Sequence, residues 1–197
     1  MKTLTIKPNE LEAVALAASK KQVRYYLNGV FFENDGGMIA TDGNRMHTMN
    51  ANPLSKWSKG FILGNADIKA IVGFCKTHAK TIDKSLQHLI VIELTHAAGD
   101  ISCRIMVEKL ELQAYRCNAV DGNFPDWRRI LPSDNEALTE ICFNAGYMGD
   151  FEKAAKLVTD TRHTYIKLEF SGGGAPIKVL CHNPAFMGVL MPVRVQL

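Results

Sequence analysis

The alternation of apolar and polar residues along the chain predicts three copies of one strand–helix–strand–strand–strand unit. Each unit opens with a short apolar strand, at 3–7, 60–64 and 138–143. A segment follows in which apolar residues recur every three or four positions, the spacing of one helix face. Three strand-like runs come after each helix, connected by glycine-containing turns. We therefore expect an α+β fold, with the helices on one face and hairpin sheets on the other.

An asparagine stands at the start of each predicted helix, at Asn9, Asn65 and Asn144. Its side chain can accept hydrogen bonds from the backbone N–H groups that have no partner in the first helical turn. We expect these three asparagines to be N-cap residues.

The later strands of each unit are predicted from their apolar and β-branched composition. They run over 24–33, 37–42 and 45–50, then 88–95, 100–108 and 110–117, and finally 164–170, 175–181 and 185–195. The segment 121–135, which contains Pro125 and Pro132, separates the second unit from the third. We interpret it as a connector between two structural units.

The composition describes an ordinary folded protein. The chain has 197 residues, of which 47% are hydrophobic, so it can bury a sizeable core. The first residues form neither a signal-peptide core nor a membrane span, which favours a cytoplasmic protein without a membrane partner. Five cysteines without any CxxC spacing predict buried, reduced thiols rather than disulfides or a zinc site.

The 23 lysines and arginines exceed the 20 acidic residues by only three, so charge alone would not hold this chain on nucleic acid. Basic side chains do gather on and just after the predicted helices, and a surface lined by these helices could contact phosphates. Acidic residues on the same helices leave open the alternative of ordinary solvated faces. The candidate DNA-facing residues are Lys20, Lys21, Lys69, Lys76, Lys80, Lys153 and Lys156.

No arrangement of residues predicts catalysis or cofactor binding. Cys75 and His78 are one helical turn apart, but no second pair of ligands has the spacing of a metal site. The glycines at 172–174 lie between predicted strands and lack the Lys-Ser/Thr of a phosphate loop. We expect neither an enzyme nor a bound metal or cofactor.

Four stretches, in order, resemble the bacterial DNA polymerase III β subunit, the DNA sliding clamp family. Residues 24–29 read RYYLNG, 41–46 read TDGNRM, 121–132 read DGNFPDWRRILP and 191–194 read MPVR. The family's counterparts read RYYLNG, TDGHRL, DGxFPDYRRVLP and MPMRL. Asn44 departs from the family's histidine and Trp127 from its tyrosine, and Gln196 and Leu197 extend past its usual end.

The resemblance implies a ring that encircles duplex DNA without reading its sequence, with helices inside and sheets outside. Such a ring tethers a DNA polymerase and is placed on DNA by a clamp loader. A closed ring is held by topology, which fits the modest net charge. Residues 1–132 resemble the family's complete middle domain, 133–136 a connector, and 137–197 the second half of the last domain.

The resemblance also implies a peptide groove for partner proteins, in which apolar side chains take hydrophobic anchors. Arg45, Arg129 and Arg194 would form its polar rim. The alternative is a packed junction between two units. The complete groove set is Leu27, Thr41, Gly43, Asn44, Arg45, Met46, Pro125, Arg129, Ile130, Val189, Met191, Pro192, Val193 and Arg194.

Family rings contain six domains, or about twelve halves, so a chain with three halves predicts a tetramer in which third halves pair about a two-fold axis. A trimer is the competing count. The rival function is a shortened, non-encircling clamp relative that binds or sequesters clamp-binding proteins. The shortened form is compatible with a bacterial or a phage genome.

Overall fold

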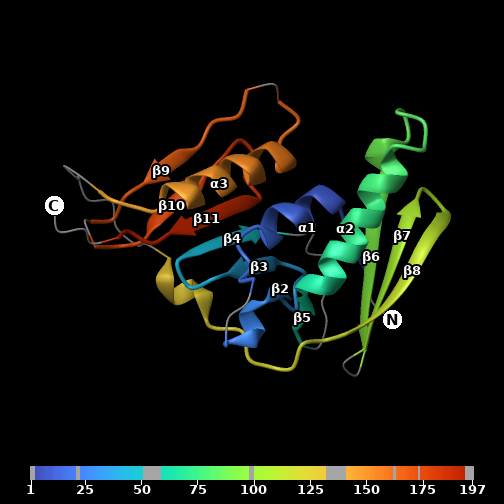
Figure 1. Ribbon diagram of the computed structural model, residues 1–197, viewed down its shortest axis with the longest axis horizontal. Coiled ribbons are helices and arrows are strands. Elements are labelled where there is room, and N and C mark those ends of the chain that lie inside the picture. The colour runs from blue at the N-terminus through green and yellow to red at the C-terminus, as the bar shows by residue number, and fades with distance from the viewer. Residues whose placement is uncertain are drawn as a thin grey trace.

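The computed structural model describes residues 3–20, 23–50, 59–97, 100–131, 141–161, 163–172 and 174–193 (Figure 1). Within these ranges the chain forms three α-helices and two antiparallel sheets. The predicted α+β class is confirmed. The described residues contain no helix that is both apolar enough and long enough to cross a membrane.

The elements follow the predicted repeat. The first unit contains β1 (Thr3–Ile6), α1 (Pro8–Ala15), β2 (Gly29–Phe32), β3 (Met38–Thr41) and β4 (Arg45–Met49). The second contains β5 (Phe61–Gly64), α2 (Asn65–Ala79), β6 (Ile90–Ala97), β7 (Asp100–Val107) and β8 (Leu110–Asn118). The third contains α3 (Ala145–Val158), β9 (Lys167–Glu169), β10 (Ile177–Leu180) and β11 (Phe186–Leu190). Short 3₁₀ turns lie at η1 (Tyr25–Leu27), η2 (Gln87–Leu89) and η3 (Trp127–Ile130).

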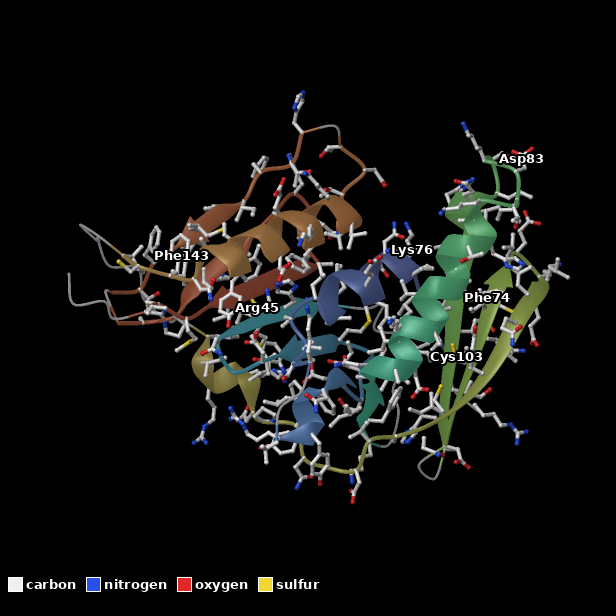
Figure 2. All side chains as sticks on the ribbon, in the orientation of Figure 1. Arg45, Phe74, Lys76, Asp83, Cys103 and Phe143 are labelled. Atoms are coloured by element: carbon white, nitrogen blue, oxygen red, sulfur yellow. The ribbon has the colours of Figure 1, made fainter. Side chains whose placement is uncertain are left out.

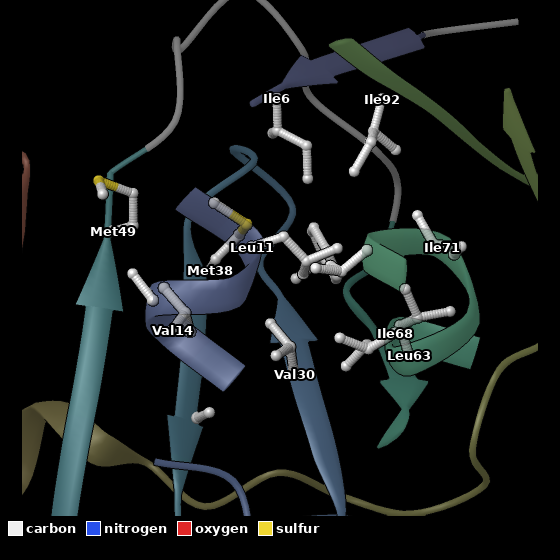
Figure 3. Close-up of a cluster of buried hydrophobic side chains, with 14 of the residues drawn as sticks. Ile6, Leu11, Val14, Val30, Met38, Met49, Leu63, Ile68, Ile71 and Ile92 are labelled. Atoms are coloured by element: carbon white, nitrogen blue, oxygen red, sulfur yellow. The ribbon is translucent and has the colours of Figure 1, made fainter. Parts of the chain in front are cut away.

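The first two units exchange their opening strands. β1 pairs with β6 of the second unit, where Leu4 lies opposite Leu94, and β5 pairs with β2 of the first unit. The second unit's sheet therefore has the order β1-β6-β7-β8. Apolar side chains from both units form one buried core beneath α1 and α2, including Leu11, Val30 and Ile71 (Figure 3). The two units are thus interlocked by strands as well as by packing.

The third unit joins the first through strand pairing. β11 lies antiparallel to β4, with Val189 opposite Met46, so one sheet runs in the order β5-β2-β3-β4-β11-β10-β9. α1 lies between α2 and α3 (Figure 1). Residues 132–140, including the expected connector 133–136, lie outside the described ranges, and the division into domains 1–132 and 137–197 stays a prediction.

The observed helix starts show that two of the three expected N-caps were wrong. α1 begins at Pro8, because proline at the first helical position needs no N–H partner, and Asn9 lies inside the first turn. Gly64 precedes α2, and the Asn65 side chain instead donates to the Ser19 carbonyl at 2.6 Å. Only Asn144 is a cap, accepting from the Gly146 N–H at 2.9 Å.

Two predicted strands also differ. The segment 24–28 contains the 3₁₀ turn η1 rather than the start of a strand, since the Leu27 N–H donates to the Arg24 carbonyl at 2.9 Å. Of the predicted strand 138–143, only 141–143 are described, and they do not form a strand. The Cys142 carbonyl nevertheless accepts from the Val193 N–H at 2.7 Å.

The cysteines are free thiols in two environments. Cys75, Cys103 and Cys117 are buried, and burial raises the pKa of the Cys75 thiol to about 11 and that of Cys103 to about 12. These three are unreactive core side chains. Cys142, in contrast, is exposed and Cys181 is half-buried, so the expectation of burial was wrong for them.

The contact between α3 and β11 depends on a missing side chain. A Cβ atom at Gly188 would lie 2.1 Å from Cε1 of Phe151. We expect Gly188→Ala to lower the free energy of unfolding by about 1–3 kcal/mol, because a buried ring would have to move. Thermal or urea unfolding measures this.

Gly73→Ala is the matched control. Gly73 lies in α2 and a Cβ there meets no neighbouring atom within 4 Å. Alanine should raise stability by roughly 0.5–1 kcal/mol through its helix propensity. Equal effects of the two substitutions would contradict the packing argument.

Candidate functional site

Arg45 joins the first unit to the third. It lies at the start of β4, and its side chain is only 7% exposed. The guanidinium donates to the carboxylate of Asp150 in α3 and, at 2.7 Å, to the Leu16 carbonyl after α1. It also pairs with Asp42 at 3.3 Å and lies 4.6 Å from the ring centroid of Tyr147. One side chain therefore fastens β4, α1 and α3 together.

This placement corrects the expectation that Arg45 lies on an exposed groove rim. Its guanidinium is buried and surrounded by partners of the same chain, so it does not face a bound peptide. Burial raises the pKa of Asp150, but hydrogen bonds from Arg45 and Lys153 outweigh that effect and hold it below its usual value. Asp150 is therefore ionised near neutral pH.

His47 lies two residues further along β4 and is fully buried at the same junction. Its Nδ1 lies 2.7 Å from the Ala13 carbonyl oxygen, which fits an Nδ1–H donor, and the ring contacts Phe151 and Phe186. Burial lowers the pKa of His47 to about 4, the Ala13 carbonyl opposes this, and the charge of Arg45 lowers it further. The imidazole is therefore neutral at pH 7.

The paired strands β4 and β11 form what we call the β4–β11 joint. A small apolar cluster lies on the face of this joint that points away from α3. Ile39, Met46 and Val189 are buried there, and Phe124, Trp127 and Leu131 of the 121–135 connector are partly buried against them. We call these six residues the joint cluster. The connector thus covers much of the apolar surface that the groove hypothesis assigns to Met46 and Val189.

Glu33 fixes the connector in place. Its carboxylate accepts from Trp127 Nε1 at 3.3 Å and from both terminal nitrogens of Arg128, at 2.5 and 2.9 Å. The Arg128 guanidinium lies 4.4 Å from the Trp127 ring centroid, and Phe31 stacks on Phe124 with centroids 4.9 Å apart. The pattern of Phe124, Trp127 and Leu131, three and four residues apart, could have predicted this packing.

The groove residues fall into three classes of exposure. Leu27, Thr41, Arg45, Met46 and Val189 are buried; Met191 and Pro192 are half-buried; Gly43, Asn44, Pro125, Arg129, Ile130 and Val193 are exposed. Arg194 lies outside the described residues. Leu27 does not belong to the joint cluster.

Several of these residues do meet. The Met191 N–H donates to the Asn44 carbonyl at 2.9 Å, which continues the β4–β11 pairing. Thr41 Oγ1 donates to the Arg45 carbonyl and accepts from the Gly43 N–H, and Gly43 has a φ of 92°, which glycine adopts without strain. The joint therefore has a rigid turn on one side and exposed or half-buried apolar residues on the other.

A hollow lies between α1, α2 and α3. Among the candidate DNA-facing residues, Lys20, Lys69, Lys76 and Lys153 line this hollow, together with the carboxylates of Glu12 and Asp150. Figure 2 shows Lys76 on α2 beside α1. We call this surface the helix-lined hollow; its four lysines outnumber its two carboxylates.

The lysines of the hollow are not equivalent. Lys76 pairs with Glu12 at 2.5 Å and Lys153 with Asp150 at 3.0 Å. Lys20 and Lys69 form no ion pair with another described residue and are therefore the more available cations. Lys80 and Lys156 are exposed outside the hollow, where Lys156 pairs with Glu152, and Lys21 is not among the described residues.

Metal binding has no support from the described part of the chain, in which no three His, Cys, Asp or Glu side chains gather as a metal site would need. Cys75 is buried in α2, and the ring of its neighbour His78 stacks on Phe74.

Comparison with known proteins supports the clamp resemblance. No family model matches the chain. The Beta sliding clamp of Vibrio cholerae is 30% identical over 181 residues, covering 88% of this chain and 43% of the relative. The Beta sliding clamp of Escherichia coli is 27% identical over 141 residues, covering 66% of this chain and 32% of the relative. The chain spans less than half the length of these curated relatives.

Solved structures share the fold. The DNA polymerase sliding clamp of Caulobacter crescentus superposes with a TM-score of 0.71 and 18% identity, covering 98% of this chain and 65% of that chain. The DNA polymerase III β subunit of Thermotoga maritima gives a TM-score of 0.71 and 16% identity, covering 100% and 66%. The resemblance to the sliding-clamp family and the DNA clamp fold are thus confirmed.

The burial of His47 predicts a pH dependence of stability. Since its pKa is about 4 in the folded protein and about 6.5 when unfolded, the unfolded state binds more protons between these values. Stability should be highest above pH 6.5 and fall on the order of 3 kcal/mol as the pH drops to 4. Urea unfolding across this range measures it.

His47→Gln is the matched variant, because its amide can donate to the Ala13 carbonyl but does not titrate. We expect the variant to show a flatter dependence between pH 6.5 and 4. An unchanged slope would assign the acid sensitivity to other groups.

Proposed function

We propose that this chain is a DNA sliding clamp, a non-enzymatic processivity factor that encircles duplex DNA as a homo-oligomeric ring and tethers a DNA polymerase. The observation that carries the proposal is the helix-lined hollow, in which three helices present lysines on one face while two antiparallel sheets form the outer wall. The same fold is found in solved sliding clamps.

The hollow is suited to weak contact with phosphates. Two of its lysines are paired with carboxylates of the chain, which limits the net attraction, and Lys20 and Lys69 remain available. Contacts of this kind hold the backbone without reading bases, and they break and re-form as the protein slides. A ring closed around DNA needs no stronger attachment.

The β4–β11 joint is the proposed partner groove. Its base is the buried joint cluster, and Ile130, Met191 and Val193 present apolar surface to an extended peptide. Methionine adapts to different partners, and the exposed Arg129 can meet an acidic side chain or a backbone carbonyl. We propose that the DNA polymerase and a clamp loader bind here, in the cytoplasm of the bacterial cell.

The proposed ring contains four chains, with a trimer as the alternative. In the first and second units, the first strand after the helix, β2 or β6, pairs with the opening strand of the other unit. The first strand after the helix in the third unit, β9, ends the seven-stranded sheet in the described structure. Pairing of third units from two chains would supply that missing neighbour.

The rival proposal is a non-encircling module that binds or sequesters clamp-binding proteins. One observation favours it. Both strands of the β4–β11 joint belong to a single chain, so a groove at this joint does not require a closed ring. Retention on circular but not on linear DNA distinguishes the ring from this module, since only a closed ring slides off free ends.

Charge reversal of the available lysines tests the hollow. We expect Lys20→Glu with Lys69→Glu to lower the rate of loading onto circular DNA roughly tenfold, because two phosphate contacts are lost before the ring closes. Single-molecule or gel-filtration assays of loading at fixed salt measure it. Lys59→Glu with Lys109→Glu, which changes the net charge equally at exposed positions outside the hollow, is the control. Equal losses in both variants would contradict a specific role of the hollow.

Shortening one side chain at the β4–β11 joint tests the groove. We expect Met191→Ala to weaken binding of a polymerase peptide about tenfold, through loss of an apolar contact, without changing the oligomeric mass. Fluorescence titration with the labelled clamp-binding segment of a bacterial DNA polymerase measures the affinity. Leu86→Ala, at a partly exposed leucine after α2, should leave it unchanged. Unaltered binding by Met191→Ala would remove the assigned groove.

A further inference from the structure

Glu33 follows β2 directly, in the turn that leads to β3. Its N–H donates to the Gly37 carbonyl at 2.8 Å, and its own carbonyl accepts from the Gly36 N–H at 3.0 Å. A Cβ atom at Gly37 would lie 3.1 Å from Oε2 of Glu33, so a larger residue would crowd the carboxylate. The turn therefore fixes the backbone of Glu33 and leaves room for its side chain.

The Glu33 carboxylate has two partners in the connector, Arg128 and Trp127. Both terminal nitrogens of Arg128 donate to it, which is the two-point geometry of a strong guanidinium–carboxylate pair. The Trp127 Nε1–H is the third donor. The Glu33 side chain is only 14% exposed, so water screens this pair less than an ion pair on the open surface. One carboxylate thus fastens the connector to a turn that is 95 positions away in the chain.

The two ends of η3 differ in what they contact. Its first two residues bind Glu33. Its last two, Arg129 and Ile130, are exposed and belong to the proposed partner groove. Because successive side chains of a 3₁₀ turn point about 120° apart, one end can be held while the other faces a partner. A movement of the held end therefore moves the groove residues with it.

We propose that Glu33 is a positioning residue of the partner groove. By holding Trp127 and Arg128, it places Arg129 and Ile130 where a bound peptide meets them. The inference rests on the proposed function, in which the β4–β11 joint binds partner proteins, and it adds a residue that acts on the partner only through its neighbours.

Loss of the carboxylate should affect partner affinity and not folding. η3 lies against β3 and β4 (Figure 1), and Trp127 and Leu131 would still pack on the joint cluster. The exposed end of η3 would instead adopt several positions, of which one suits the peptide. Binding would then have to select that position, and this lowers the affinity.

Glu33→Gln tests the proposal, because it removes the charge but keeps an oxygen for the Trp127 N–H. We expect it to weaken binding of the labelled clamp-binding segment of a bacterial DNA polymerase about fivefold in a fluorescence titration. The oligomeric mass and the thermal unfolding curve should stay close to those of the parent chain.

Glu93→Gln is the matched control. Glu93 also accepts from an arginine, Arg104, at 2.7 Å, but it lies in β6 of the four-stranded sheet and outside the joint cluster. This variant should bind the peptide as the parent chain does.

Arg128 distinguishes positioning from direct contact with the peptide. If Glu33 acts through Arg128, Arg128→Gln should weaken binding about as much as Glu33→Gln, and the double variant should bind no more weakly than either. Losses that add in the double variant would mean that the two side chains act separately, which contradicts the proposal.

The position of η3 can be measured without a partner. When Trp57, the other tryptophan of the chain, is replaced by phenylalanine, tryptophan fluorescence reports Trp127 alone. Trp127 is half-buried, so we expect Glu33→Gln to increase the quenching of this fluorescence by acrylamide and Glu93→Gln to leave it unchanged.

Two further results would overturn the inference alone: peptide binding by Glu33→Gln equal to that by Glu93→Gln, or unchanged quenching of Trp127. A parent chain that binds no peptide refutes the proposed groove instead, and with it the role assigned to Glu33. The behaviour of the parent chain thus tells the two failures apart.

Discussion

The ion pair between Arg45 and Asp150 is the interaction on which the arrangement of this protein depends. It joins residues 105 positions apart and is completed by the Leu16 carbonyl, Asp42 and the Tyr147 ring. Loss of Asp150 would leave the buried guanidinium with Asp42 as its one carboxylate partner among the described residues, which is more costly than never having built the pair. The first and third units are therefore held in one relative position.

The seven-stranded sheet and the helix-lined hollow both follow from that position. With α3 fixed over the Leu16 end of α1, β11 lies beside β4 and Phe151 fills the space over Gly188. Asp150 then serves both surfaces, since one oxygen accepts from Arg45 and the other from Lys153 at the rim of the hollow. The seven-stranded sheet and the helix-lined hollow thus share the same carboxylate.

The sequence predicted the helices and strands, which depend on neighbouring residues. It did not predict the contacts between residues that are far apart in the chain. Strand and helix periodicity identified the three units because it depends on neighbouring residues. The caps were less certain, since Pro8 and Gly64 compete with Asn9 and Asn65 for the helix start. The burial of Arg45 could not be predicted, because nothing in the TDGNRM stretch indicates a carboxylate in α3. The covering of Met46 by Trp127 depends on Glu33, which is 94 residues from the tryptophan.

The exchange of β1 and β5 between the first two units also sets the order in which this chain can fold. β1 is made first but has no strand partner until β6 exists, and β2, which pairs with β3 on one edge, gains its second neighbour only with β5. β4 also pairs with β3, and its second edge waits longest, since β11 begins at Phe186. Contacts between such distant segments close large loops and slow folding. During synthesis, the segment that carries Arg45 therefore leaves the ribosome long before its carboxylate and its neighbouring strand, and this junction is the last part of the described fold to be completed.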